Sequence, residues 1–92
     1  MNEPISAVAT ISNIRGLHAR AAAKFGAIAS SFKADVHVEY DGWRVRGDSI
    51  MGLLMIGAGP GAEIAISAAG PQAAEAVDAL AKFVADKFGE KE

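Results

Sequence analysis

The stretch that decides the fold is Val36-His-Val-Glu-Tyr-Asp-Gly-Trp-Arg-Val-Arg46. Within it, Asp41-Gly42 separates two runs in which apolar and polar residues alternate, and such a pair is typical of a two-residue type I′ turn. The pattern predicts a β-hairpin that pairs Tyr40 with Trp43, Val38 with Val45, Glu39 with Arg44 and His37 with Arg46. One face of this hairpin is apolar and the other is charged. We therefore expect the core to receive Val36, Val38 and Val45.

The chain before the hairpin predicts one strand and one helix. Residues 5–11 alternate with period two, which is typical of a strand, and a loop over residues 13–16 follows. Residues 19–31 are rich in alanine, and an apolar stripe at helical spacing comprises Phe25, Ile28 and Phe32. This segment predicts an amphipathic helix that buries one face.

The chain after the hairpin predicts two helices with a strand between them. A short helix is expected over residues 50–55, capped by Asp48 or Ser49. Residues 63–68 alternate again as a strand. A last helix with one apolar stripe is expected to end near Gly89.

The resulting order, βαββαβα, predicts an α+β fold. We expect a two-layer open-faced sandwich in which a four-stranded antiparallel sheet carries three helices on one face, with residues 1–92 forming a single domain. The tail Glu90-Lys91-Glu92 is expected to fray.

Composition excludes several classes of function. A net charge of −2 over 92 residues disfavours nucleic acid as the main ligand, since duplex binding depends on clustered Lys and Arg. The chain has no cysteine, so thiolate chemistry is excluded and a reducing, cytoplasmic compartment is expected. No apolar stretch is long enough to cross a membrane, and two isolated histidines give no metal-site spacing. We expect a monomer that holds no metal or cofactor.

His18 is the first candidate site residue because it falls between a glycine-containing loop and the start of the first helix. The free N–H groups of a first helical turn attract anions, and Arg20 adds a guanidinium that matches phosphate oxygens. The same positive field keeps a ring nitrogen unprotonated and nucleophilic. The residues alone leave two interpretations open: a phosphate acceptor, or a helix cap beside a solvated arginine.

Two separated motifs extend this interpretation. Gly16-Leu17-His18-Ala19-Arg20-Ala21-Ala22 resembles the Gly-Leu-His-Ala-Arg-Pro-Ala signature of HPr, the histidine-containing phosphocarrier of the phosphoenolpyruvate-dependent phosphotransferase system. Asp48-Ser49-Ile50-Met51-Gly52-Leu53 resembles the regulatory-serine motif of the same family. The family also shares the βαββαβα order, so the resemblance covers nearly the whole chain.

The resemblance implies a role for three residues. His18 matches the histidine that is phosphorylated on Nδ1, Arg20 matches the arginine that helps to hold the phosphoryl group, and Ser49 matches the serine that HPr kinase/phosphorylase modifies in some bacteria. The implied donor is enzyme I, and the implied acceptor is the IIA domain of a sugar permease or a regulatory IIA protein. The family member is a carrier rather than a stand-alone enzyme.

Two positions depart from the family pattern. Ala21 replaces the signature proline, and because alanine is an excellent helix former we expect activity to survive. Asp48 replaces a frequent lysine before the regulatory serine and would repel a phosphate on Ser49. These departures favour a divergent, nitrogen-related regulatory branch over sugar transport. For Ser49, a helix cap is the competing interpretation.

A carrier must dock reversibly on several partners, which requires an exposed apolar patch near His18. The candidates for this patch are Leu17, Ala21, Ile50, Met51 and Leu54. The competing interpretation is that these side chains belong to the core.

The sequence thus supports two leading hypotheses. The first is a phosphocarrier with a phosphohistidine at His18, and the second is a non-catalytic regulatory binding module of the same architecture. A small ferredoxin-like nucleic-acid binder is disfavoured by charge and aromatic content. His37 is predicted to lie on the solvated sheet face and receives no role.

Overall fold

The predicted hairpin forms in the predicted register. In the computed structural model, which describes residues 4–92, β2 (Asp35–Tyr40) pairs antiparallel with β3 (Trp43–Arg46). All the expected pairs are present, from Tyr40 opposite Trp43 to His37 opposite Arg46. Asp41 and Gly42 have φ angles of 52° and 83°, as the two central positions of a type I′ turn require.

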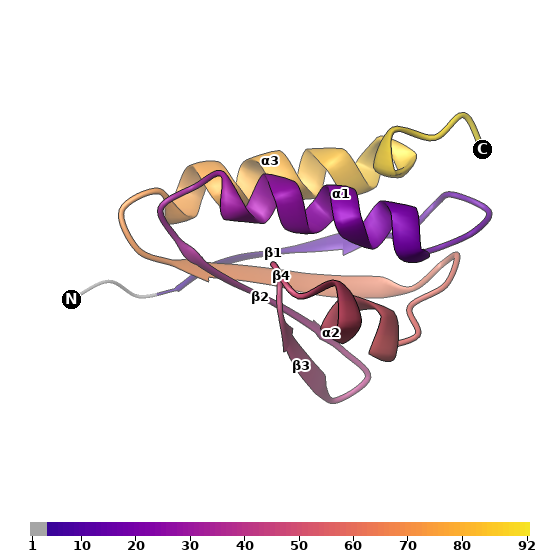
Figure 1. Cartoon of the computed structure of the whole chain (residues 1–92), viewed down its shortest axis with the longest axis horizontal. Helices are drawn as coiled ribbons and strands as arrows, with labels where there is room; N and C mark the ends of the chain where they lie inside the picture. Colours follow the sequence, from indigo (N-terminus) through magenta and orange to yellow (C-terminus); the bar gives the residue numbers. More distant parts are fainter. Residues whose placement is uncertain (1–3) are drawn as a thin grey trace.

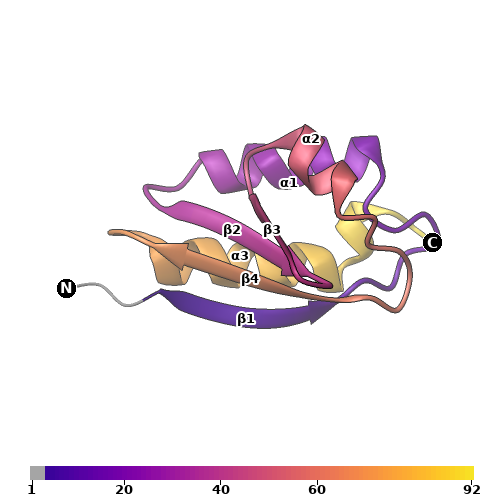
Figure 2. The ribbon, with the colours of Figure 1, turned by 90° about the horizontal axis from the view of Figure 1, so that it is seen from below.

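The remaining strands complete a four-stranded antiparallel sheet in the order β1-β4-β2-β3. β1 covers Ile5–Thr10 and β4 covers Glu63–Ala69. Figure 1 shows α1 (Ala19–Ser30) and α3 (Ala73–Ala85) side by side across one face of this sheet, and Figure 2 shows the strands from the opposite face. The expected α+β open-faced sandwich is confirmed.

The short helix α2 (Ile50–Met55) also forms where the sequence predicts it. It packs beside α1 and against β3. Within the described part of the chain, no helix is both long and apolar enough to cross a membrane.

The core lies between the sheet and the two long helices. Val36 and Val38 are buried there as predicted, while Val45, on the edge strand β3, packs against the core but stays partly exposed. The largest fully buried apolar side chains come from the three helices, from β2 and β4, and from the segments after β1 and α3: Phe25, Phe88, Ile11, Leu53, Ile64, Ile66, Leu80, Val38 and Val84. Alanines on α1 and α3, such as Ala22 and Ala76, are fully buried and allow close packing.

The end of the chain departs from the sequence prediction. The last helix ends at Ala85 rather than near Gly89, because Lys87 and Phe88 have left-handed φ angles of 58° and 55° within a short 3₁₀ turn, η1 (Lys87–Gly89). This reversal buries Phe88 completely, with its ring edge-on to that of Phe83 at 5.6 Å between centroids. Burial of an aromatic ring offsets the backbone strain of the turn.

The reversal directs the last residues back onto the molecule (Figure 1). The Ile14 N–H donates to the Glu92 carbonyl at 2.6 Å, and the Glu90 side chain contacts His18. The expectation that residues 90–92 fray is therefore wrong.

Core packing on β4 gives a stability prediction. Ile66 is fully buried between its cross-strand partners Ala7 and Val38, so Ile66→Val should lower the free energy of unfolding by about 1 kcal/mol through the lost methylene group. Val8, which is 68% exposed on β1, provides the control: Val8→Thr keeps the branched Cβ and should change stability by less than about 0.5 kcal/mol. Urea denaturation of the three proteins measures both effects, and equal losses would contradict this description of the core.

Candidate functional site

His18 is the N-cap of α1. Its backbone is extended, with φ −81° and ψ 178°, and its carbonyl accepts the first helical hydrogen bond from the Ala22 N–H at 2.8 Å. The ring atom Nδ1 accepts a hydrogen bond from the Arg20 N–H at 3.3 Å. The side chain is 20% exposed. The imidazole therefore sits at the positive end of the helix with one nitrogen directed at a backbone donor.

The turn before His18 depends on glycine. Gly16 has a φ of 66°, and a Cβ there would lie 2.8 Å from the Gly59 Cα and 2.9 Å from the Ala58 carbonyl oxygen. The next residue, Leu17, donates its N–H to that same Ala58 oxygen at 3.1 Å. Since backbone cannot give way as a flexible side chain can, only glycine fits both the angle and the space.

A carboxylate completes the site from the far end of the chain. Glu90 places Oε2 against Nε2 of His18, while its Oε1 accepts a hydrogen bond from Asn13 Nδ2 at 2.7 Å. Asn13 is fully buried and also donates to the Gly16 carbonyl at 2.9 Å. The hydrogen bonds from Asn13 and then His18, with the nearby charge of Arg15, hold the pKa of Glu90 below its ordinary value.

Sequence reasoning missed Asn13 and Glu90. Glu90 lies in a polar tail for which the sequence predicts fraying, and nothing local to it indicates a partner 72 positions away. Asn13 did carry a signal. The alternation of β1 points Ala9 and Ile11 inward, and the next inward position, 13, holds a polar residue, which in a core needs a specific partner.

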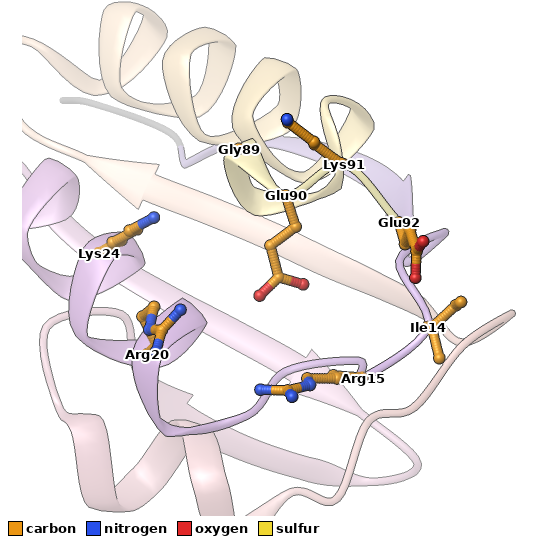
Figure 3. Close-up of a pocket in the computed structure, with 8 residues that line it drawn as sticks. All are labelled: Ile14, Arg15, Arg20, Lys24, Gly89, Glu90, Lys91 and Glu92. Carbon is orange, nitrogen blue, oxygen red and sulfur yellow. The ribbon is translucent and has the colours of Figure 1, made fainter.

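Basic side chains line the groove that Glu90 also lines. Arg15, Arg20 and Lys24 line a shallow groove of about 500 Å³ together with Ile14 and residues 89–92. Figure 3 shows the carboxylate of Glu90 extending into this groove between the two arginines. Arg20 is exposed and lies two residues from His18, as the sequence predicts for a phosphate-binding guanidinium.

Ser49, the predicted regulatory residue, is the N-cap of α2. Its Oγ accepts a hydrogen bond from the Gly52 N–H at 3.0 Å, so of the two expected caps the structure uses Ser49. Asp48 instead pairs with Arg46 at 3.0 Å, and the Arg46 guanidinium holds the pKa of the Asp48 carboxyl below its ordinary value. Ser49 is half-buried.

The predicted apolar patch is only partly present. Ile50, Met51 and Leu54 are exposed on α2, at 45%, 72% and 38%. The prediction that Leu17 and Ala21 are exposed is wrong. Leu17 is buried because its backbone is hydrogen-bonded down onto Ala58, and Ala21 is buried because it shares the inner face of α1 with Phe25.

Two exposed apolar side chains near these residues were not predicted. Met55 is 65% exposed at the end of α2, and Ile14 is 68% exposed in the loop before His18. Leu53 is the single buried residue of α2, so Met55 lies at the surface of this short helix.

Comparison with known proteins identifies a family. A family model described as the PTS HPr component phosphorylation site matches residues 5–86. A phosphocarrier protein HPr from Cupriavidus necator is 43% identical over 83 residues, which cover 90% of this chain and 93% of that protein. A phosphocarrier protein NPr from Shewanella violacea is 40% identical over 81 residues, or 88% of this chain and 89% of that one.

Solved structures show the same fold. The crystal structure of HPr from Thermoanaerobacter tengcongensis superposes with a TM-score of 0.91 at 39% identity, covering 96% of this chain and 99% of that one. A structure described as an HPr dimer from the same organism superposes with a TM-score of 0.75 at 43% identity, covering 82% of this chain and 86% of that one. With its family match and these relatives, the chain belongs to the HPr family of phosphocarrier proteins of the phosphotransferase system.

Proposed function

We propose that His18 accepts a phosphoryl group on Nδ1 from phosphorylated enzyme I and passes it to a IIA protein or domain. The observation that carries this proposal is the position of the ring at the start of α1, where Nδ1 accepts the Arg20 N–H and therefore holds its lone pair. The resemblance to HPr and NPr relatives supports the same role.

The chemistry needs few groups from this chain. The Nδ1 lone pair attacks phosphorus as the bond to the donor's leaving atom breaks, and the electron pair of that bond stays with the donor. The free N–H groups at the start of α1 and the Arg20 guanidinium then stabilise the phosphoryl oxygens. Partners supply the remaining groups, so the protein acts as a carrier rather than a stand-alone enzyme.

The acceptor defines the branch of the system. The proposal includes both a sugar-permease IIA domain and a regulatory IIA protein, and the Ala21 and Asp48 departures favour the regulatory one. The carrier is proposed to act as a cytoplasmic monomer, because a histidine that meets successive partners must be free to leave each of them.

Phosphorylation at His18 is the first test. Incubation with enzyme I and phosphoenolpyruvate should add one acid-labile phosphate, measured as an intact-mass increase, and His18→Ala should abolish it because the proposal places the phosphate on His18. His37→Ala is the matched control, since His37 lies on the sheet opposite Arg46, and it should be phosphorylated like the wild type. If the wild-type protein gains no phosphate with an active enzyme I, the chain is a non-catalytic binding module instead.

In this proposal, loss of the Arg20 side chain slows phosphoryl acceptance but does not abolish it. Arg20→Ala should fold normally, because the side chain is exposed, but should slow phosphoryl acceptance about tenfold or more through loss of a charge-assisted hydrogen bond. Rapid-quench measurement of phosphorylation by enzyme I gives the rate. Arg44→Ala removes the same charge from the ion pair with Glu39 on the sheet, and a comparable loss there would assign the effect to net charge rather than to Arg20.

The exposed apolar residues of α2 are proposed as the docking surface. Ile50, Met51 and Leu54 lie on the helix that Ser49 caps, so a phosphate added by HPr kinase/phosphorylase would place about two negative charges at the edge of this surface. Such a charge would weaken docking on an acidic partner. Ser49 is thus proposed as a modification site as well as a cap.

Substitution at Ser49 separates the two roles. Asp and Asn are both good N-caps, so Ser49→Asp and Ser49→Asn should preserve α2, which circular dichroism and urea denaturation can verify. Only the Asp variant adds charge, and it alone should raise the carrier concentration that half-saturates enzyme I. Equal kinetics for the two variants would count against regulation at this position.

A further inference from the structure

The two ring nitrogens of His18 face opposite kinds of partner. Nδ1 accepts the Arg20 N–H at 3.3 Å, so it cannot carry a proton in that contact. Nε2 contacts Oε2 of Glu90, and an ionised carboxylate only accepts hydrogen bonds, so the proton lies on Nε2. Both contacts therefore specify the same neutral tautomer.

The carboxylate is itself held in place. Asn13 uses both N–H groups of its amide, one on the Gly16 carbonyl at 2.9 Å and one on Glu90 Oε1 at 2.7 Å. The reverse orientation of the amide would direct Oδ1 at these two acceptors, so the hydrogen-bond network fixes how the side chain lies.

Asn13 also has a buried polar atom that destabilises the fold, and packing around the residue does not explain why it is there. It is fully buried, and its Oδ1 has no hydrogen-bond partner among the described residues. A buried polar atom without a partner destabilises a fold. The residue is accounted for by its two donors, which link the turn before His18 to the tail that carries Glu90.

We infer that Asn13 and Glu90 are positioning residues that hold His18 in the Nε2–H tautomer and so keep the Nδ1 lone pair available for phosphoryl acceptance. The inference rests on the proposed function for its consequence, but the tautomer itself is a property of the resting protein. The low pKa of Glu90 agrees with an ionised carboxylate at neutral pH.

The pair also acts during transfer. When Nδ1 bonds to phosphorus and the donor keeps the electron pair of the broken bond, no proton has to leave His18, because Nδ1 carried none. The ring gains positive charge as this bond forms, and the proton on Nε2 stays between the ring and the Glu90 carboxylate. A negative charge at that position stabilises the phosphorylated imidazole relative to the donor.

Glu90→Gln tests the inference. A glutamine has only one oxygen for the two acceptor positions that Asn13 and Nε2–H require, so one contact is lost or the ring changes tautomer. The share of the Nδ1–H tautomer, read from imidazole ¹⁵N shifts of the unphosphorylated protein, should rise. The single-turnover phosphorylation rate at saturating concentration should fall about tenfold or more, as for carboxylates that orient histidine in metal sites. The half-saturating concentration should stay within about twofold, since α2 is unchanged.

Asn13→Asp is the second variant, because it replaces both donors by an acceptor of the same shape. It should shift the tautomer in the same direction, and combined with Glu90→Gln it should add little, since the two residues act as one unit. Glu75→Gln is the matched control. Glu75 lies in the first turn of α3, about 15 Å of helix before the end of α3, and its variant should leave both readouts unchanged.

The outcomes separate this inference from the proposed function. If Glu90→Gln leaves the tautomer share and the saturated rate within about twofold of wild type, the inference is overturned while phosphorylation of His18 stands. A slower rate without a tautomer change also overturns it, because Glu90 would then act on docking or on charge alone. If the wild-type protein is not phosphorylated at all, the proposed function fails, and the ¹⁵N shifts still decide whether Asn13 and Glu90 set the tautomer.

Discussion

The close approach of two backbone segments, at Gly16 and at residues 58–59, fixes where α1 begins and therefore where His18 lies. The contact is part of a longer series of backbone hydrogen bonds between the same two segments. The N–H and carbonyl of Ile11 pair with Ala62 and Gly61, and the Leu17 N–H pairs with Ala58. The loop after β1 is thus tied to the loop before β4 at several points. A helix whose preceding loop is held by these hydrogen bonds has a defined first turn, which an anion-binding site requires.

The features that depend on neighbouring residues could be predicted from the sequence. The hairpin register follows from Asp41-Gly42 and the alternation around it, and the structure has each expected pair. The starts of α1 and α2 follow from capping at His18 and Ser49, whose side chains both accept backbone hydrogen bonds. These signals are local, so they survive without knowledge of the packed state.

The features that depend on packing could not be predicted from the sequence. Lys87 and Phe88 are residue types that rarely adopt positive φ, and they do so because the turn buries the Phe88 ring against Phe83. That burial, with the hydrogen bonds from Asn13 and Ile14 to the tail, brings Glu90 to His18. Likewise, Ala21 belongs to the inner face of α1 only because α1 packs against α3 and α2, and a motif quoted as letters does not say which of its residues face inward.

The site combines a buried supporting residue with an exposed surface, and this combination suits a protein that passes a group from one partner to another. Asn13 is fully buried and anchors Glu90, whereas His18 remains 20% exposed and Met51, on α2, is 72% exposed. A deeper pocket would stabilise the phosphoryl group more strongly, but a carrier that binds its cargo too well cannot release it to the next protein. On the proposed function, orientation of the ring through Glu90 and Asn13 would add reactivity without enclosing the phosphoryl group. The groove that Arg15, Arg20 and Glu90 line is open to solvent, so in the proposed transfer the partner surface is left to exclude water.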